Sequence, residues 1–279
     1  MLTMYSITYD LHNRKIIHPY ELDIFIPEHN LAIEVGSAYW HGEKNGKLEN
    51  YHSEKWKRCR ALGITLLQFF DDDIFTFWHL TESKILRCLK LSSVPVIGAR
   101  KITIGKPSRQ EEQRFLTEWH TKGWAAVRSD SVGGYYNGKL IAIMTIKKSS
   151  NANRISIDRW ATNINYSFPG LFSRLLSSWI KKENFKGTIE TWCDNRLGTG
   201  KVYQSAGFFE KECSSPGYWY FKNSGLENRI RYQRHKLKSL FDLSDYENRR
   251  ELTEYDIMLS QGYDRLWDAG HTKWTKEII

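Results

Sequence analysis

The segment LDIFIPEHNLAIEV, residues 22–35, holds two short apolar runs separated by a four-residue turn candidate, PEHN. Proline and asparagine are typical turn residues, so we expect the runs to pair as an antiparallel hairpin in which Ile26 faces Leu31. Counting back along that register places Asp23 directly opposite Glu34, on the same face of the sheet. The segment therefore predicts two carboxylates side by side in mainly apolar surroundings.

Two like charges placed opposite each other are destabilising unless a positive charge lies between them. Neither apolar run contains a Lys or Arg. A hard divalent cation is the natural candidate, Mg²⁺ with Mn²⁺ as a substitute, because it binds through one or two carboxylates together with waters and substrate phosphates. The alternative is a solvated hairpin face that carries two unrelated acids.

The composition favours a chain of two domains with a polyanionic partner. The 279 residues are 41% hydrophobic, which is enough to bury a sizeable core, and the net charge is +9. Nucleic acid is the first partner that such a charge suggests, and an acidic membrane surface is the second.

Four widely spaced cysteines form no C-x-x-C pair, which argues against a zinc ribbon or a redox motif. We interpret them as reduced thiols of a cytoplasmic protein. The N-terminus lacks the features of a signal peptide, and no apolar run reaches transmembrane length, so no membrane partner is expected.

The fold class predicted by the pattern is α/β, or more broadly α+β. The first 90 or so residues predict the strands of a small mixed sheet together with helices. One of these helices is expected from Ser53 to Leu62 and is ended by Gly63. The continuous apolar run Ile64 to Phe70 is typical of a buried strand. The best linker candidate is 92–107, which is rich in Pro and Gly.

The second half of the chain also predicts alternating strands and helices. Ser108 and Glu111 have the spacing of a capping box at a helix start, and Asn137-Gly138 is a strong two-residue hairpin turn. Further strands are expected at 140–146, 155–160, 188–192 and 217–221, and helices at 170–182 and 200–205.

The segment RIRYQRHKLK, residues 229–238, contains five Lys or Arg and no acid. On a helix, Ile230 and Leu237 would share one face and a basic ridge would form at three- and four-residue spacing. Such a ridge suits a phosphate backbone, although a solvated charged face is the alternative. The nucleic-acid-binding candidates are Arg229, Arg231, Arg234, Lys236 and Lys238.

Beyond the acid pair, the chain continues into Tyr39-Trp40-His41-Gly42, followed by Lys-x-x-x-Cys-x-x-x-Gly-Ile at 55–64. Together with ELDIFIP at 21–27 and AIEV at 32–35, this text resembles the core of the PD-(D/E)xK nuclease superfamily. The likeness is to its very-short-patch-repair branch and to the related phage homing endonucleases. It implies a restriction-endonuclease-like mixed sheet with flanking helices.

The resemblance implies that Asp23 is the principal metal ligand and Glu34 the second acid, with Mg²⁺ as the cofactor. His41 would assist water activation or charge stabilisation. The superfamily lysine two residues after the second acid is here Gly36, so Lys55 from the next helix is the expected substitute. The homing branch also carries a glutamate on a helix before the hairpin, which this sequence does not include.

Residues 100–223 resemble a GNAT-like acetyltransferase fold. The likeness lies in Gly138-Lys139-Leu140 entering a strand and in VYQSAGF at 202–208. In that family a Gly-rich loop presents N–H groups to a pyrophosphate. The matching loop here, NYSFPG at 165–170, retains one glycine and gains a proline that lacks a donor. We therefore interpret the likeness as one of fold alone, and acyl-CoA is not an expected partner.

These observations predict a nuclease-like domain over 1–94, a GNAT-like domain over 95–223 and a basic, DNA-contacting extension over 224–279 that packs on the second domain. The resulting hypothesis is a Mg²⁺-dependent endodeoxyribonuclease of phage homing type that binds double-stranded DNA, in the host cytoplasm if it is phage-encoded. The alternatives are a GNAT-type acyltransferase that uses Tyr203 as its acid beside a vestigial nuclease domain, or a non-catalytic DNA-binding protein. The oligomeric state is not readable.

Overall fold

The computed structural model describes residues 2–125, 130–151, 153–222, 225–241 and 252–279. The chain divides into two compact units, and neither is one continuous stretch of sequence. Unit 1 consists of Met1–Thr76, Asn195–Leu197 and Ser215–Gly270, and unit 2 of Phe77–Asp194, Gly198–Ser214 and His271–Ile279. The boundaries of these units, which are defined by packing, do not coincide with the domain boundaries expected after residues 94 and 223. Within the described ranges, no helix is long and apolar enough to cross a membrane.

Unit 1 is built on a four-stranded sheet with the strand order β1-β2-β3-β4. The hairpin of β2 and β3 is antiparallel, and Ile26 pairs with Leu31, which confirms the predicted register. Asn30 closes the turn with φ +44°, a left-handed conformation that asparagine tolerates. The strands are β1 (Asp10–Asn13), β2 (Leu22–Ile26), β3 (Leu31–Gly36) and β4 (Thr65–Phe70).

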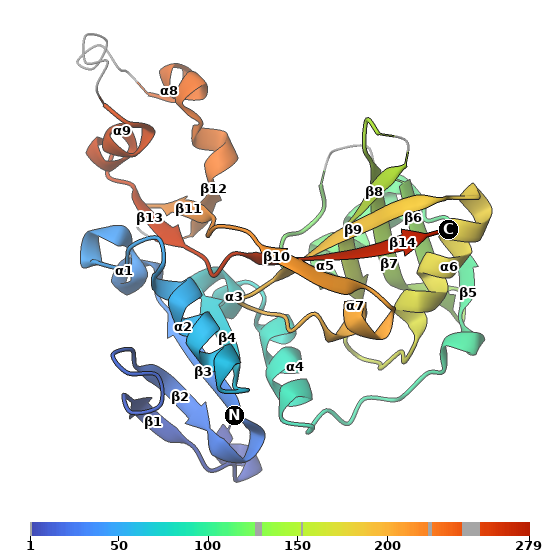
Figure 1. Ribbon diagram of the computed structural model, residues 1–279, viewed down its shortest axis with the longest axis horizontal. Coiled ribbons are helices and arrows are strands. Elements are labelled where there is room, and N and C mark those ends of the chain that lie inside the picture. Colours follow the sequence, from blue (N-terminus) through green and yellow to red (C-terminus); the bar gives the residue numbers. More distant parts are fainter. Residues whose placement is uncertain (1, 126–129, 152, 223–224, 242–251) are drawn as a thin grey trace. The chain divides into compact units, whose positions relative to one another are not determined.

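The parallel pair β3 and β4 is connected through α1 (Ala38–His41) and α2 (Tyr51–Ala61), and α2 packs on the sheet (Figure 1). A parallel pair needs such a crossover, and a helix supplies it. Helix α2 begins two residues before the predicted Ser53, because the Ser53 hydroxyl donates to the Asn50 carbonyl 3.0 Å away and does not cap the helix. Gly63, with φ +73°, follows its end as predicted.

The rest of unit 1 includes a three-stranded sheet with the order β12-β11-β13. Its strands are β11 (Tyr218–Phe221), β12 (Leu226–Asn228) and β13 (Asp264–Trp267). The helices are α3 (Asp71–Phe75), α8 (Arg234–Leu240) and α9 (Glu254–Ser260), and the 3₁₀ turns are η1 (Leu2–Tyr5), η2 (Pro27–His29), η3 (Glu43–Asn45) and η5 (Arg229–Tyr232).

Residues 229–238 do not form the one continuous helix on which a basic ridge would depend. The segment forms the 3₁₀ turn η5, leaves helical geometry at Gln233, and begins α8 at Arg234. Tyr232 and Leu237 are both buried in one cluster, and a break between them lets both side chains reach it. The three- and four-residue spacing of a continuous basic ridge is therefore lost.

Unit 2 contains a seven-stranded sheet with the order β10-β14-β9-β8-β7-β6-β5, in which β8 and β9 are parallel and the other neighbours antiparallel. Strand β14 lies between β9 and β10 (Figure 1). The expected C-terminal extension thus ends inside this sheet. The strands are β5 (Thr103–Gly105), β6 (Asp130–Tyr136), β7 (Lys139–Lys148), β8 (Arg154–Thr162), β9 (Gly187–Asp194), β10 (Phe209–Cys213) and β14 (His271–Ile278).

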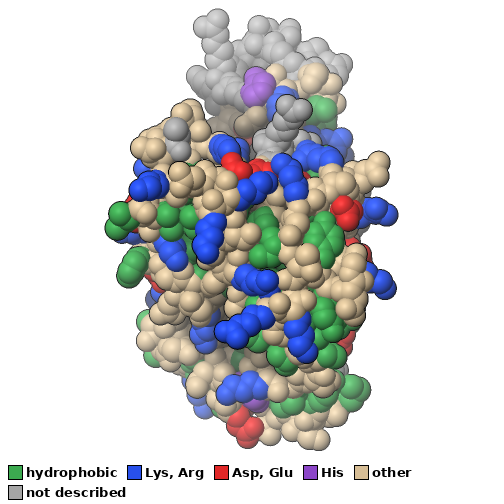
Figure 2. Space-filling model, turned by 90° about the vertical axis from the view of Figure 1, so that its right-hand side faces the viewer, with side chains coloured by type: hydrophobic (Ala, Val, Ile, Leu, Met, Phe, Trp, Pro, Cys, Tyr) green, Lys and Arg blue, Asp and Glu red, His purple; other side chains and the backbone are tan. Residues whose placement is uncertain are grey.

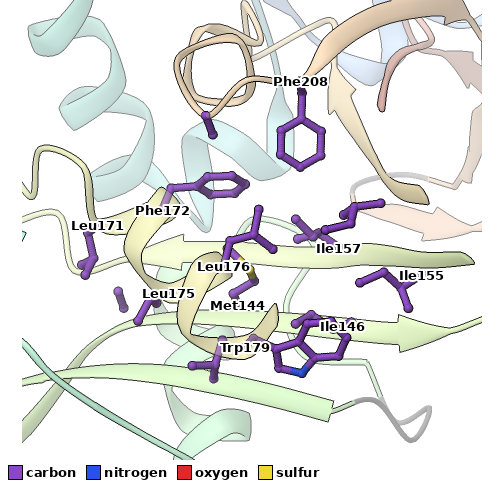
Figure 3. Close-up of a cluster of buried hydrophobic side chains, with 14 of the residues drawn as sticks. Met144, Ile146, Ile155, Ile157, Leu171, Phe172, Leu175, Leu176, Trp179 and Phe208 are labelled. Atoms are coloured by element: carbon purple, nitrogen blue, oxygen red, sulfur yellow. The ribbon is translucent and has the colours of Figure 1, made fainter. Parts of the chain in front are cut away.

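The helices of unit 2 supply the apolar faces that bury the sheet. Phe172, Leu176 and Trp179 of α6 point toward Met144 and Ile157 of the sheet (Figure 3). Helix α5 packs its own apolar residues in a second cluster. The predicted capping box of α5 and the hairpin turn at 137–138 are both confirmed. The helices are α4 (Trp78–Cys88), α5 (Arg109–Trp119), α6 (Leu171–Glu183) and α7 (Lys201–Ser205), with the 3₁₀ turn η4 (Ala99–Lys101). The predicted α+β fold class is confirmed.

Candidate active site

A row of polar side chains crosses the face of the unit 1 sheet that α2 covers. Glu34 pairs with Gln68 in the parallel ladder, and the register of β2 and β3 brings Asp23 opposite Glu34. Side chains at paired positions point to the same face. The neighbouring row, Phe25, Ala32 and Leu66, belongs to the apolar cluster under α2. The carboxylates therefore lie at the border of a hydrophobic core.

The two acids that the sequence singled out lie together and are linked through the backbone. The Asp23 N–H donates to Glu34 Oε1 at 3.1 Å, and the Val35 N–H donates to Asp23 Oδ2 at 2.9 Å. These bonds hold each carboxylate against the opposite strand. Glu34 is almost completely buried, whereas Asp23 is half-buried. Asp23 is thus the more accessible of the two oxygen donors.

Lys55 reaches this pair from α2. Its ammonium forms a buried ion pair with Glu34 Oε2. A lysine distant in sequence from the hairpin, the one that the sequence analysis expected on the next helix, thus supplies a positive charge beside the two acids. Burial raises the pKa of Glu34 to about 7, although the Lys55 charge acts in the opposite direction.

Position 36 of β3 has little space for a side chain. A Cβ on Gly36 would lie 3.0 Å from Phe70 Cδ1 and 3.3 Å from His41 Nδ1. Those rings fill the space that a side chain on the strand would need.

His41 lies beside a second histidine that the prediction of the site did not include. His41 Nδ1 is 3.4 Å from His52 Nε2, and His52 is three residues before Lys55 on α2. Burial lowers the pKa of His41 to about 4, and the Lys55 charge acts in the same direction. His41 is therefore a neutral imidazole at physiological pH.

Gln68 is the other site residue that the prediction missed. Its Nε2 donates to the His52 carbonyl at 3.0 Å, so it connects β4 to the start of α2. Its Oε1 and His52 Nδ1 are buried and have no hydrogen-bond partner within the described residues. The sequence signal was a polar amide side chain in the middle of the mainly apolar run 64–70.

The donor set at this site suits a hard cation bound by few protein ligands. In the ranges that the structure describes, no group of three or more His, Cys, Asp or Glu side chains could hold a metal. Two carboxylates are compatible with Mg²⁺, which keeps several waters and also binds substrate phosphates. The Val35 amide engages Oδ2 of Asp23, so Oδ1 is the oxygen through which Asp23 would coordinate. Asp23 could therefore offer Oδ1 to Mg²⁺ or Mn²⁺ directly, whereas both oxygens of Glu34 already accept hydrogen bonds, from the Asp23 N–H and from Lys55, so Glu34 would reach the ion through a remaining lone pair or a water.

Of the five basic residues expected to bind nucleic acid, the structure describes the side chains of Arg231 and Lys236. Arg231 is exposed and pairs with Glu227 at 3.0 Å, and Lys236 is half-buried on α8. The side chains of the other candidates, Arg229, Arg234 and Lys238, lie outside the described part of the structure, as does that of Ile230. Figure 2 shows Lys and Arg side chains spread over one face of the molecule with few acids among them.

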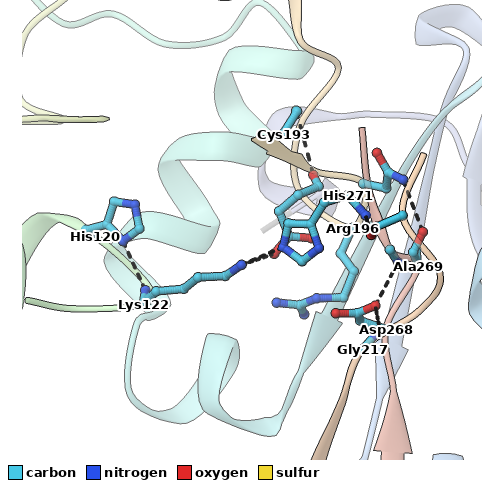
Figure 4. A network of polar contacts seen from close by, with 12 residues as sticks. His120, Lys122, Cys193, Arg196, Gly217, Asp268, Ala269 and His271 are labelled. Atoms are coloured by element: carbon cyan, nitrogen blue, oxygen red, sulfur yellow. Dashed lines mark hydrogen bonds and ion pairs between the residues drawn. The ribbon is translucent and has the colours of Figure 1, made fainter. Parts of the chain in front are cut away.

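Polar clusters away from the acid pair engage their groups internally (Figure 4). In unit 2, Lys122 Nζ lies 2.6 Å from His271 Nε2 and 3.7 Å from Asp194 Oδ2. In unit 1, Arg196 pairs with Asp73 at 2.8 Å. We therefore interpret these contacts as stabilising the fold.

Unit 2 contains a place where two parallel strands part. The ladder between β8 and β9 ends at Ile157 and Thr191, although β8 continues to Thr162 and β9 to Asp194. Tyr203 hydrogen-bonds the Thr191 side chain there, and burial raises the pKa of Tyr203 to about 12. Its ring packs against Phe172, Phe208 and Trp274.

The loop that leads into α6 is bonded to other segments of unit 2. The Ser167 N–H donates to the Pro95 carbonyl at 2.9 Å, and the Ile97 N–H donates to the Ser167 carbonyl at 2.8 Å. The Arg87 guanidinium donates to two further carbonyls of the loop. One amide of this loop, that of Ser167, is thus already engaged by the chain itself.

No protein-family model and no curated protein matches the chain. Solved structures of acetyltransferases do match. An acetyltransferase from Bacillus anthracis str. Ames, in complex with acetyl coenzyme A, has a TM-score of 0.30 and 14% identity. The alignment covers 55% of this chain and 64% of that one, less than two thirds of its length.

Two further matches cover almost the whole of the other chain. The Escherichia coli ribosomal-protein-S18-alanine N-acetyltransferase has a TM-score of 0.37 and 14% identity, over 63% of this chain and 94% of that one. The Bacillus subtilis acetyltransferase in complex with CoA has a TM-score of 0.36 and 12% identity, over 64% and 99%. Scores and identities this low say nothing about the substrate or ligand of this chain.

Proposed function

We propose that unit 1 hydrolyses phosphodiester bonds of DNA with a divalent metal, Mg²⁺ or Mn²⁺, at the acid pair. The observation that carries the proposal is the juxtaposition of Asp23 and Glu34 on adjacent strands, with Lys55 against Glu34. Carboxylates and a lysine on one face of a sheet suit the developing charge of phosphoryl chemistry. The net charge of +9 supports a nucleic-acid substrate.

Each side chain has a distinct part in this proposal. Asp23 and Glu34 would hold the metal, which when bound would polarise the phosphate and stabilise its added charge. Lys55 orients Glu34 through their ion pair, and its charge favours the ionised form of Glu34 against the effect of burial. His41 is neutral because of its low pKa, so its imidazole can accept a proton from the attacking water. His52 contacts His41 and is a positioning residue.

Nicking of a supercoiled plasmid in Mg²⁺ tests the proposal. Asp23→Asn is expected to lower the rate at least about a hundredfold, the order of loss when one electrostatic contact to a transition state is removed. Asp10→Asn is the matched control, because Asp10 is exposed on β1 of the same sheet. Equal nicking by wild type and Asp23→Asn would contradict the proposal.

Transfer of an acyl group in unit 2 is the second candidate. It is favoured by the parting of β8 and β9 next to Tyr203, whose hydroxyl could protonate a leaving thiolate. The contacts of the loop before α6 argue against it, because the linker engages the Ser167 amide and carbonyl. The nuclease proposal is therefore the one that we favour.

Calorimetry with acetyl-CoA tests the second candidate. That candidate predicts saturable binding with about one site, and the absence of any heat of binding at micromolar protein would contradict it. Tyr203→Phe should leave such binding intact and abolish transfer, because the ring would remain in its aromatic cluster. Saturable binding together with loss of transfer in Tyr203→Phe would establish the second candidate.

A further inference from the structure

A pocket of about 650 Å³ opens in unit 1 next to the proposed active site. Its volume lies in the range of pockets that hold small organic ligands. All of its lining residues belong to unit 1. They are Tyr20, Glu43, Gly46, Leu48, Glu49, Asn50, Tyr51, Arg265 and Trp267.

Three of the nine lining residues are aromatic, namely Tyr20, Tyr51 and Trp267. The rings of Tyr20 and Tyr51 meet edge to face with their centroids 5.6 Å apart. Trp267 and the guanidinium of Arg265 come from β13. Planar side chains of this kind stack on planar ligands, and every nucleobase has such a face.

One wall is fixed by hydrogen bonds that also cancel its charge. Glu43 accepts from Arg265 Nε at 2.7 Å and Nη2 at 2.8 Å, and from Trp267 Nε1 at 2.9 Å. The Arg265 guanidinium also lies 3.7 Å from the ring centroid of Tyr255. A bidentate pair of this kind holds both side chains in place.

The charges around the pocket favour a nucleobase over a phosphate group as the ligand. Glu43 is neutralised by Arg265, but Glu49 adds an exposed carboxylate to the lining. Carboxylates repel phosphate, whereas they accept hydrogen bonds from the exocyclic amino groups of bases. Lys47 Nζ lies 4.1 Å from the ring centroid of Tyr51, where it can contact the backbone of the same nucleotide.

Tyr51 connects this pocket to the acid pair. Lys55 Nζ lies 5.4 Å from the ring centroid of Tyr51 and contacts Glu34. The Asp23 and Glu34 charges also act to raise the pKa of Tyr51, although burial is the larger cause. A nucleotide with its phosphate at the acids therefore has the pocket within reach of its base.

We infer that the pocket holds one unpaired base of the DNA strand that is cut. This inference rests on the proposed function and narrows its substrate class to DNA with a single-stranded, bulged or flipped nucleotide. A paired base inside the stack cannot enter a pocket of this kind, so it would have to leave the duplex. The energy of unpairing makes an already unpaired base the better ligand.

Binding measured in EDTA tests the inference without any cleavage. Two labelled duplexes are compared, one fully paired and one with a single bulged 2-aminopurine. The bulged duplex should bind at least about tenfold more tightly, as expected when one base stacks on aromatic side chains. The fluorescence of 2-aminopurine should fall on binding because its ring stacks.

Tyr20→Leu should reduce the preference for the bulge to within about twofold while binding to paired DNA stays unchanged. Tyr5→Leu is the matched control, because Tyr5 is an exposed tyrosine of unit 1 that does not line the pocket. Leu48→Trp is a second test at the exposed rim, where it fills the pocket without removing a core side chain. It too should abolish the preference.

Equal affinities for the two duplexes, or a preference that survives both Tyr20→Leu and Leu48→Trp, would overturn the inference about the pocket. Metal-dependent nicking could still occur in that case, so the proposed function would stand. Failure to bind either duplex would contradict both proposals.

Discussion

Lys55 of α2 and Glu34 of β3 form an ion pair in which each side chain is 1% exposed. Such a pair has lost the hydration of both charges, and it persists because each partner compensates the other. The ion pair connects α2 to the hairpin of β2 and β3 at the site where we propose catalysis.

Removing Lys55 should destabilise unit 1 strongly, because Glu34 would then be a buried charge without its partner. Lys55→Met is expected to cost about 3–5 kcal/mol of unfolding free energy, measured by urea denaturation. Lys57→Met is the control on the same helix, since its pair with Glu54 is exposed and should contribute at most about 1 kcal/mol. An unchanged midpoint for Lys55→Met would contradict the buried pair.

The raised pKa of Glu34 predicts a pH dependence of stability. Its pKa is about 7 in the folded chain against an ordinary value of 4.5, so the folded state binds more protons between these values. The contribution of Glu34 is thus complete below about pH 4.5 and is lost as the pH rises to about 7. Relative to Glu34→Gln, the wild type should lose up to about 3 kcal/mol from pH 4.5 to 7. Urea titrations of both proteins across that range measure the difference, and parallel curves would refute it.

Gly36 should tolerate no side chain. Gly36→Ala would press a methyl group against Phe70 and His41, and overpacking of this kind costs about 1–3 kcal/mol. Gly98→Ala is the control, because a Cβ there meets nothing within 4 Å and φ is −60°. Thermal unfolding of the two variants gives the comparison, and equal melting temperatures would be inconsistent with the packing described.

Local signals in the sequence were sufficient to predict the hairpin. Alternation and turn residues determine the register of a short antiparallel pair, and the register determines that Asp23 and Glu34 are neighbours. The partner of Lys55 could not be predicted in this way, because the contact depends on how α2 packs. Gln68 lies next to Glu34 for the same tertiary reason.

The C-terminal part of the chain was the least predictable. Strand β14 returns to the unit 2 sheet after the long segment Ser215–Gly270, which belongs to unit 1. The hydrophobic periodicity of neighbouring residues does not indicate that a strand pairs with strands so distant in the sequence. The basic segment 229–238 does not form one helix because Tyr232 and Leu237 are both buried. The number of charged residues in a segment does not reveal which of its other residues are buried.

Binding of Mn²⁺, followed by electron paramagnetic resonance of the free ion, tests the central claim most directly. The account predicts one bound Mn²⁺ for the wild type and for Asp10→Asn at neutral pH or above, and at least tenfold weaker binding for Asp23→Asn. Affinity should fall by up to about tenfold per pH unit below pH 7, because Glu34 must then release a proton. Equal binding of Mn²⁺ by the wild type and Asp23→Asn would contradict the account.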